Sequence, residues 1–127
     1  MHIIDINIHN IINFTLKKMT VIELALLRKA LMQSQNYLEF GSGNSTLLAT
    51  EIETIKHITV VESDASFWNE KLLNIPSIKC GVYTKRIKPL LINIGPTGEW
   101  GYPIDNSNQN QWPLYSSSAF HEKTSYD

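Results

Sequence analysis

The chain has 127 residues, 43% of them hydrophobic and 18% charged, which is typical of a globular domain rather than of a disordered or fibrous protein. Its 11 basic and 12 acidic residues give a formal net charge of -1, and no basic stripe could neutralise a run of phosphates, so nucleic acid is not an expected partner. The single cysteine, Cys80, excludes an internal disulfide or a thiolate zinc site within one chain. The four histidines show no ligand spacing, and no metal is expected.

Residues 1–18 are rich in Ile and Asn and follow neither a helical nor a strand period. We interpret them as a poorly specified extension. Two alternatives stay open for it: a leader that precedes a natural start at Met19, or an element packed on the edge of the domain. No stretch of the chain approaches the roughly 18 to 20 consecutive apolar residues that span a bilayer, and no signal peptide opens it. We therefore expect a cytoplasmic protein with no membrane partner.

Residues 19–94 carry the regular structure. Thr20 is a helix cap with Glu23 three residues on, and the apolar spacing that follows predicts a helix to about Ser34. Strands are expected at residues 36–40, 57–62 and 90–94, and helices at 45–53 and 65–73, whereas residues 78–85 are ambiguous between helix and strand. This order predicts an α/β, partial Rossmann-like three-layer fold with a short parallel sheet.

A glycine turn lies between the first expected strand and the helix that follows it. Gly41 permits a tight turn, Gly43 lets the backbone come close to a ligand that a Cβ atom would repel, and the start of the helix offers unpaired N–H donors. The candidate binding residues in this turn are Glu39, Gly41, Ser42, Gly43, Asn44 and Ser45.

A second candidate pair, Glu62 and Ser63, ends the next strand about twenty residues after the glycine turn, where an acidic side chain can accept both hydroxyls of a ribose. Thr46 stands where a dinucleotide fingerprint requires Gly or Ala. Glu39 is poorly placed beside a pyrophosphate and well placed for a cationic ligand, and S-adenosylmethionine carries a sulfonium and an ammonium group. The alternative is a simple tight turn with no ligand.

The motifs E-F-G-S-G-N-S and V-V-E-S-D together resemble the first two motifs of class I S-adenosylmethionine-dependent methyltransferases, over roughly residues 20–93. The resemblance implies that S-adenosylmethionine is the cofactor, with Glu39, Gly41 and Gly43 around its methionine part and Glu62 on its ribose. Asn93, after the third strand, matches the position that contacts the adenine amino group. Its alternative role is to bond its own turn.

Residues 95–127 are rich in Gly, Pro, Asn and Gln without a periodic segment, which predicts a long irregular loop. It is similar to a loop of a group of bacterial methyltransferase-like proteins. Three of its aromatic residues could form a lid or an acceptor wall over the cofactor, or could anchor the loop on the core. They are Trp100, Tyr102 and Trp112.

The resemblance also implies a seven-stranded sheet of order 3-2-1-4-5-7-6, in which the residues that touch the methyl acceptor follow strand four. A Tyr-Asp pair commonly opens that strand, and Tyr126-Asp127 ends this chain. We therefore expect the cofactor-binding half of a methyltransferase, truncated and with impaired or no catalysis. A non-catalytic interaction subunit and an NAD-binding oxidoreductase fragment are the alternatives. The sequence indicates neither the methyl acceptor nor a catalytic residue.

The same expectation bears on self-association. If strand four is absent, the first strand has an unpaired edge. Its side chains Tyr37, Leu38 and Phe40 are of the kind that is normally buried. The sequence thus predicts that the chain either oligomerises through this edge or aggregates.

Overall fold

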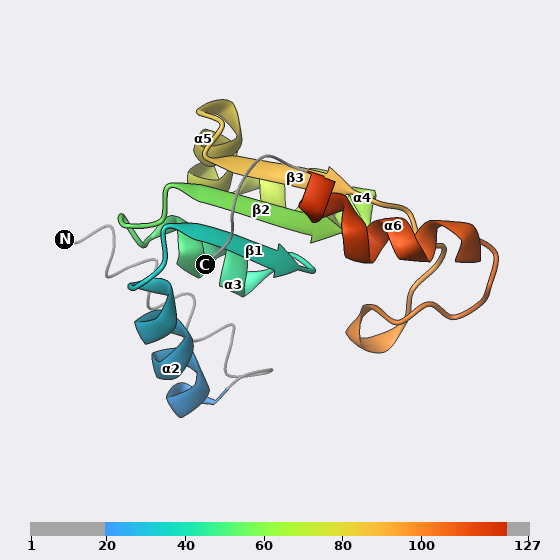
Figure 1. The fold of residues 1–127 in the computed structure, drawn as a ribbon, viewed down its shortest axis with the longest axis horizontal. Helices are drawn as coiled ribbons and strands as arrows, with labels where there is room; N and C mark the ends of the chain where they lie inside the picture. The colour runs from blue at the N-terminus through green and yellow to red at the C-terminus, as the bar shows by residue number, and fades with distance from the viewer. Residues whose placement is uncertain (1–19, 122–127) are drawn as a thin grey trace.

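The chain folds as a three-stranded sheet flanked by helices in a computed structural model that describes residues 20–121 (Figure 1). The expectations on residues 1–18, on a start at Met19 and on Tyr126-Asp127 lie outside the described residues. Helices and strands follow the order α2 (Val21–Leu31), β1 (Asn36–Phe40), α3 (Asn44–Thr50), β2 (His57–Glu62), α4 (Ala65–Glu70), α5 (Pro76–Tyr83), β3 (Ile87–Leu91) and α6 (Trp112–Ser117). Short 3-10 helices span Leu72–Asn74, Glu99–Gly101, Gln109–Gln111 and Ser118–His121.

The sheet is parallel and its order is β1-β2-β3, with Tyr37 paired with Ile58 and Ile58 with Ile87. The predicted α/β class and short parallel sheet are confirmed. Central strand β2 is buried from Ile58 to Glu62, as expected of a parallel strand covered on both faces. Within the described residues β1 pairs with β2 alone, and the Phe40 side chain is 47% exposed. Self-association through this edge stays a prediction.

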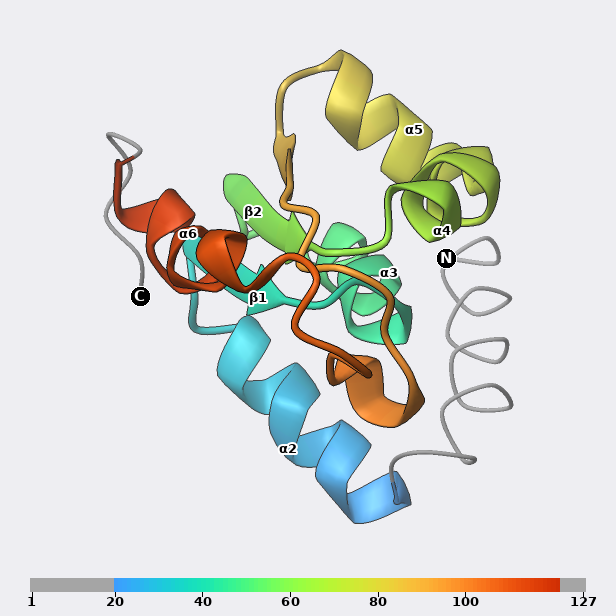
Figure 2. The ribbon, with the colours of Figure 1, turned by 90° about the vertical axis from the view of Figure 1, so that its right-hand side faces the viewer.

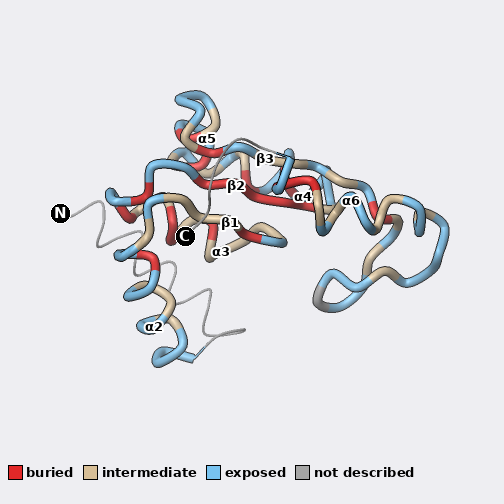
Figure 3. The backbone as a smooth tube through the Cα atoms, in the orientation of Figure 1, coloured by how far each residue is buried: buried red, intermediate tan, exposed pale blue. Residues whose placement is uncertain are grey.

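The two faces of the sheet are covered by different parts of the chain. Figure 2 looks along the strands from their carboxyl ends and places α3, α4 and α5 on one side of the sheet and α6 on the other. The main core lies on the first side, where Ile58 and Val60 of β2 meet Leu48, Trp68 and Ile78 from the helices. Figure 3 shows that burial is concentrated in β2, while the segment between β3 and α6 is mostly exposed.

The early elements form where the sequence predicts them. The Thr20 hydroxyl accepts a hydrogen bond from the Glu23 amide at 3.1 Å and caps α2, and β1 and β2 have the predicted bounds. The third strand, predicted at 90–94, instead spans Ile87–Leu91. That prediction was wrong because Pro89 breaks the apolar pattern, although β3 is an edge strand, where a missing N–H is tolerated.

Two later segments also differ from the sequence predictions. The helix predicted at residues 65–73 is shorter in the structure, where α4 ends at Glu70 and α5 begins at Pro76, whose fixed φ is compatible with the first turn of a helix. The expectation of an irregular loop after residue 95 is wrong for its last part, because α6 forms with Pro113 in its first turn. Six residues are too few for a helical period to stand out in the sequence.

Arg86, just before β3, joins the sheet to the end of α3. Its guanidinium donates hydrogen bonds to the carbonyl oxygens of Ile55 (3.0 Å), Thr50 (2.9 Å), Ile52 (2.7 Å) and Ala49 (3.4 Å). Carbonyl groups at a helix C-terminus have no partner within the helix, and a cation also interacts favourably with that end of the helix dipole. One side chain therefore fixes the α3–β2 connection against β3.

We expect Arg86→Ala to lower the free energy of unfolding by about 2 to 4 kcal/mol, because several half-buried carbonyl groups would lose a charged donor. Arg86→Lys should recover part of this loss, since an ammonium group cannot reproduce the planar fork of donors. Denaturant titration measures the change. Lys79→Ala, which removes an exposed cation from α5, is the matched control, and an equal loss in both variants would contradict this role for Arg86.

Candidate functional site

Two acidic side chains come together where β1 and β2 end. Parallel strands present their carboxyl ends at one edge of a sheet, and Phe40 of β1 is in register with Val61 of β2. The Gly41 amide donates a hydrogen bond to the Val61 carbonyl at 2.7 Å, so pairing continues into the glycine turn. Glu39 and Glu62 are both 6% exposed and lie on either side of this turn.

Glu39 is held by the first turn of α3. The hydroxyl of the fully buried Thr46 donates to both carboxylate oxygens, at 3.0 and 2.9 Å, and the Ser45 hydroxyl donates to Oε1. Thr46 Oγ1 in turn accepts the Gly43 amide at 3.0 Å. Thr46 was considered in the sequence only as a mismatch to a dinucleotide motif. Its position three residues after Gly43, where a capping side chain reaches back, is the signal that could have revealed this role.

Glu62 is tied to the glycine turn from the other side. Its Oε1 accepts the Ser42 amide at 2.9 Å and also the Ser42 hydroxyl, and its Oε2 accepts the Asp64 amide at 2.8 Å. Asp64 caps α4 by accepting the Phe67 amide at 3.0 Å. The structure therefore joins the two sequence motifs through a direct contact between Ser42 and Glu62.

The glycine turn faces open space. A Cβ atom added at Gly41 or at Gly43 would meet no atom within 4 Å, so neither glycine is needed to avoid a neighbour. Gly41 has a φ of +82°, which only glycine adopts readily, whereas Gly43, with a φ of 164°, is extended. Asn44 is the first residue of α3. The turn thus leaves its backbone open to the approach of a ligand.

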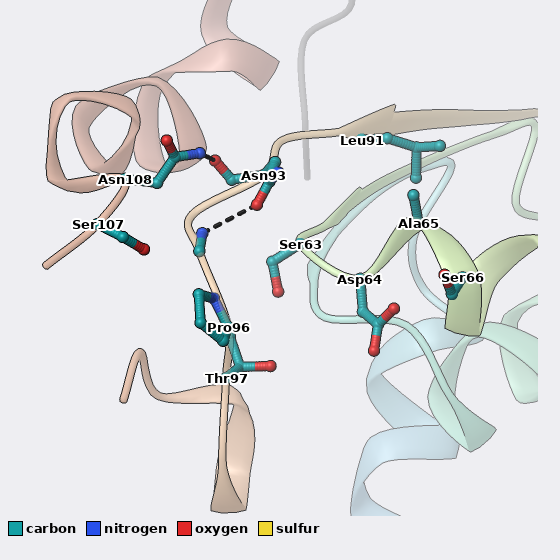
Figure 4. Close-up of a pocket in the computed structure, with 11 residues that line it drawn as sticks. Ser63, Asp64, Ala65, Ser66, Leu91, Asn93, Pro96, Thr97, Ser107 and Asn108 are labelled. Carbon is teal, nitrogen blue, oxygen red and sulfur yellow. Dashed lines mark hydrogen bonds between the residues drawn. The ribbon is translucent and has the colours of Figure 1, made fainter. Parts of the chain in front are cut away.

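A pocket of about 660 Å³ adjoins this turn, between the β2–α4 turn and the segment after β3 (Figure 4). Of the predicted binding residues, Ser63 and Asn93 line it, while the glycine turn and both buried carboxylates do not. The candidate site therefore has two parts that meet at Glu62. The pocket is lined by Ser63, Asp64, Ala65, Ser66, Leu91, Asn93, Gly95, Pro96, Thr97, Ser107 and Asn108.

Asn93 lies two residues beyond the end of β3, at the mouth of the pocket. Its side-chain oxygen accepts the Gly95 amide at 2.9 Å, and its carbonyl accepts the Asn108 side chain at 2.6 Å. The alternative role considered for it, bonding its own turn, is therefore realised. The second lone pair of the amide oxygen is still available to a ligand donor.

Two of the three aromatic residues predicted as a lid or acceptor wall, Tyr102 and Trp112, do not line the pocket. The indole N–H of Trp112 donates to the Ile94 carbonyl at 3.0 Å, so this residue anchors α6, as the alternative held. Tyr102 is 72% exposed, and the side chain of Trp100 lies outside the described residues. Sequence reasoning missed Tyr115 of α6, whose ring lies 5.8 Å from that of Phe40 at the end of β1.

Burial and charge shift the acid–base properties of three groups at this edge. Burial raises the pKa of Glu39 from 4.5 to about 7, with a further contribution from Glu62, although the Ser45 and Thr46 hydroxyls oppose the shift. Burial and the charge of Glu39 raise the pKa of Tyr37. Burial and then the charges of Glu62 and Glu39 raise the pKa of Tyr115. Tyr115 is therefore within electrostatic reach of both carboxylates.

Residues 20–121 contain neither a metal-binding cluster of acidic, His and Cys side chains nor a membrane-spanning helix. No group of three His, Cys, Asp or Glu side chains in that range is arranged to hold a metal ion. None of the helices in the same range is both long and apolar enough to cross a membrane. Within the described residues, the glycine turn and its adjoining pocket therefore form the candidate ligand-binding site.

Comparison with known proteins supports a methyltransferase-like fold. No protein-family model and no curated protein matches the chain. Among solved structures, a methyltransferase-like protein from Silicibacter pomeroyi DSS-3 matches with a TM-score of 0.64 and 28% sequence identity. The match covers 84% of this chain and 54% of that protein, so the chain spans about half the length of this relative. The expected resemblance is confirmed: the fold is part of a methyltransferase-like fold.

The raised pKa of Glu39 makes the free energy of unfolding depend on pH. Between pH 4.5 and 7 the folded chain holds a proton on Glu39 that the unfolded chain has lost, so the free energy of unfolding falls as pH rises, in total by about 3 kcal/mol. We expect Glu39→Gln to flatten this part of the profile and to gain stability relative to the parent above pH 7. Melting curves from pH 4 to 8 measure it.

The control for this series is Glu70→Gln, which neutralises an exposed acid on α4 and should keep the parent profile. A Glu39→Gln profile with the parent's slope would contradict burial of an unfavourable charge at Glu39. The same result would show that another group controls the pH dependence.

The two glycines give a matched pair of substitutions. Gly43→Val should leave the melting temperature nearly unchanged, because its backbone is extended and its Cβ position is open, yet the added side chain should fill ligand space. Gly41→Ala should lose about 1 kcal/mol or more of stability, because alanine strains at a positive φ. Circular dichroism melting beside ligand titration separates these effects, and a large melting loss in Gly43→Val would favour a purely structural turn.

Proposed function

We propose that this chain binds S-adenosylmethionine as the cofactor-binding part of a methyltransferase. The methionine end of the cofactor would lie over the glycine turn, beside Glu39, and the ribose would lie at Glu62. The adenine would enter the pocket between Ser63 and Asn93. One observation carries the proposal: the glycine turn and the acid at the end of β2 are joined by the hydrogen bonds between Ser42 and Glu62.

The residues of the turn fit such a ligand in two respects. Open space at the Cβ positions of Gly41 and Gly43 allows a ligand to approach the backbone. Within the described residues, the hydrogen bonds to Glu39 and Glu62 come from neutral groups, namely serine and threonine hydroxyls and backbone amides. Two buried carboxylates without a cationic partner there favour a positively charged ligand.

Ribose binding would require one local rearrangement. Both oxygens of Glu62 already accept hydrogen bonds, and the Ser42 hydroxyl is the donor most easily replaced, because its side chain can rotate away. The Ser42 and Asp64 amides would remain in place and orient the carboxylate. A ribose hydroxyl would then substitute for the serine hydroxyl at little cost, since one donor replaces another.

We also propose that methyl transfer is impaired or absent in this chain alone. The chain spans about half of its solved relative. The pocket residues include hydroxyls, amides and the helix-capping Asp64, and none of these is poised as a general base with a second group to orient it.

A dinucleotide such as NAD is disfavoured by the same contacts. Thr46 occupies the position where a dinucleotide fold needs a small residue for close helix–strand packing, and the buried carboxylate of Glu39 would repel phosphate charge. A non-catalytic interaction subunit built on this fold would differ from the main proposal in needing no cofactor. Ligand binding therefore separates the three functions.

Calorimetric titration with S-adenosylhomocysteine and with NAD is the direct test. We expect S-adenosylhomocysteine to bind and NAD not to bind. Glu62→Gln should weaken binding by about 1 to 3 kcal/mol, the range for a charged hydrogen-bond partner, whereas Glu70→Gln on the outer part of α4 should leave it unchanged. Equal or preferential binding of NAD would refute the cofactor assignment, and no binding of either ligand would favour an interaction subunit.

A further inference from the structure

Helix α6 is fixed over the carboxyl ends of the strands, on the face opposite α3 (Figures 1 and 2). Trp112 at its start is bonded to the Ile94 carbonyl. The 3-10 turn that follows α6 contacts β2 and places Ala119, which is fully buried like Val61 of β2, in the interior. Because both ends of this segment are attached, the side chains between them have defined positions.

Tyr115 is the aromatic residue of this segment that reaches the candidate site. Its ring packs against Phe40, 5.8 Å between centroids and at 49° between planes, and Phe40 stands between Glu39 and Gly41 in the chain. Its phenol is half-buried and lies in the field of both Glu62 and Glu39. Burial and then that field disfavour a phenolate, so the ring is neutral at physiological pH and has an electron-rich face.

The proposed position of the cofactor would bring its positively charged sulfur near the Tyr115 ring. The sulfonium joins the ribose to the methionine chain. If Glu62 holds the ribose and the methionine lies beside Glu39, the sulfonium lies between these two carboxylates, whose charges both act on the Tyr115 phenol. An aromatic face within about 6 Å attracts a cation but gives no such attraction to the neutral thioether of S-adenosylhomocysteine.

We propose that Tyr115 is a specificity-determining residue that recognises the sulfonium charge, so that the site distinguishes S-adenosylmethionine from S-adenosylhomocysteine. This inference rests on the proposed function. It places a residue of α6, outside both sequence motifs, in the binding site. This residue would distinguish a cationic ligand from a neutral one.

The test compares the affinities of both ligands for the 127-residue chain at pH 8, where Glu39 is ionised. Tyr115→Leu should lower the preference for S-adenosylmethionine over S-adenosylhomocysteine by about two- to thirtyfold, the range for a cation–aromatic contact. Tyr115→Phe should keep the preference, because it retains the ring and loses only the hydroxyl. Tyr102→Leu, on the exposed loop, should change neither affinity.

Melting curves show whether each variant is folded, and Tyr115→Met, which is unbranched and adapts to an irregular gap, makes the same prediction if Tyr115→Leu does not fold. An equal loss of affinity for both ligands in the folded variant would overturn the inference, as would a preference lost in Tyr115→Phe. These results would leave cofactor binding intact. Failure of the parent chain to bind either ligand would instead overturn the proposed function, and this inference with it.

Discussion

Two carboxylates are buried on either side of the glycine turn where β1 and β2 end, and the surrounding hydrogen bonds satisfy them. An unpaired buried charge is costly, so Glu39 and Glu62 draw hydrogen bonds from the turn between β1 and α3. Thr46 and Ser45 bond Glu39, while Ser42 bonds Glu62. These contacts fix the backbone of the turn, which explains how a turn that is open to solvent keeps its conformation.

Most of the stability of this arrangement comes from elsewhere in the molecule. The apolar core between β2 and helices α3 and α5 positions the strands, and Arg86 holds the end of α3 against β3. The Arg86 contacts lie at the opposite end of α3 from the glycine turn. The site can therefore hold a carboxyl group with a raised pKa, Glu39, because the cost of burying it is offset by packing at the other end of α3.

On the second face of the sheet, α6 and the turn after it have a defined position although their sequence shows little helical periodicity. Trp112 and Ala119 attach α6 and the following turn to the sheet. Neither contact has a local signature, because each depends on a partner far away in the sequence. Tyr115 is brought to Phe40 by this attachment and not by any preference of its own six-residue helix, which is too short to be stable alone.

The sequence by itself determined the order of the helices and strands as far as Glu62. It also determined the glycine turn and the acid at the end of β2 that accompanies it. These features follow from local periodicity and from backbone conformations that few residues adopt. Only the tertiary structure decided the start of β3, where the edge position tolerates Pro89, and the role of Thr46 between Glu39 and Gly43. It also decided the place of Tyr115. Each of these depends on contacts between segments, and the free energy of such contacts is not encoded in any one local stretch of the chain.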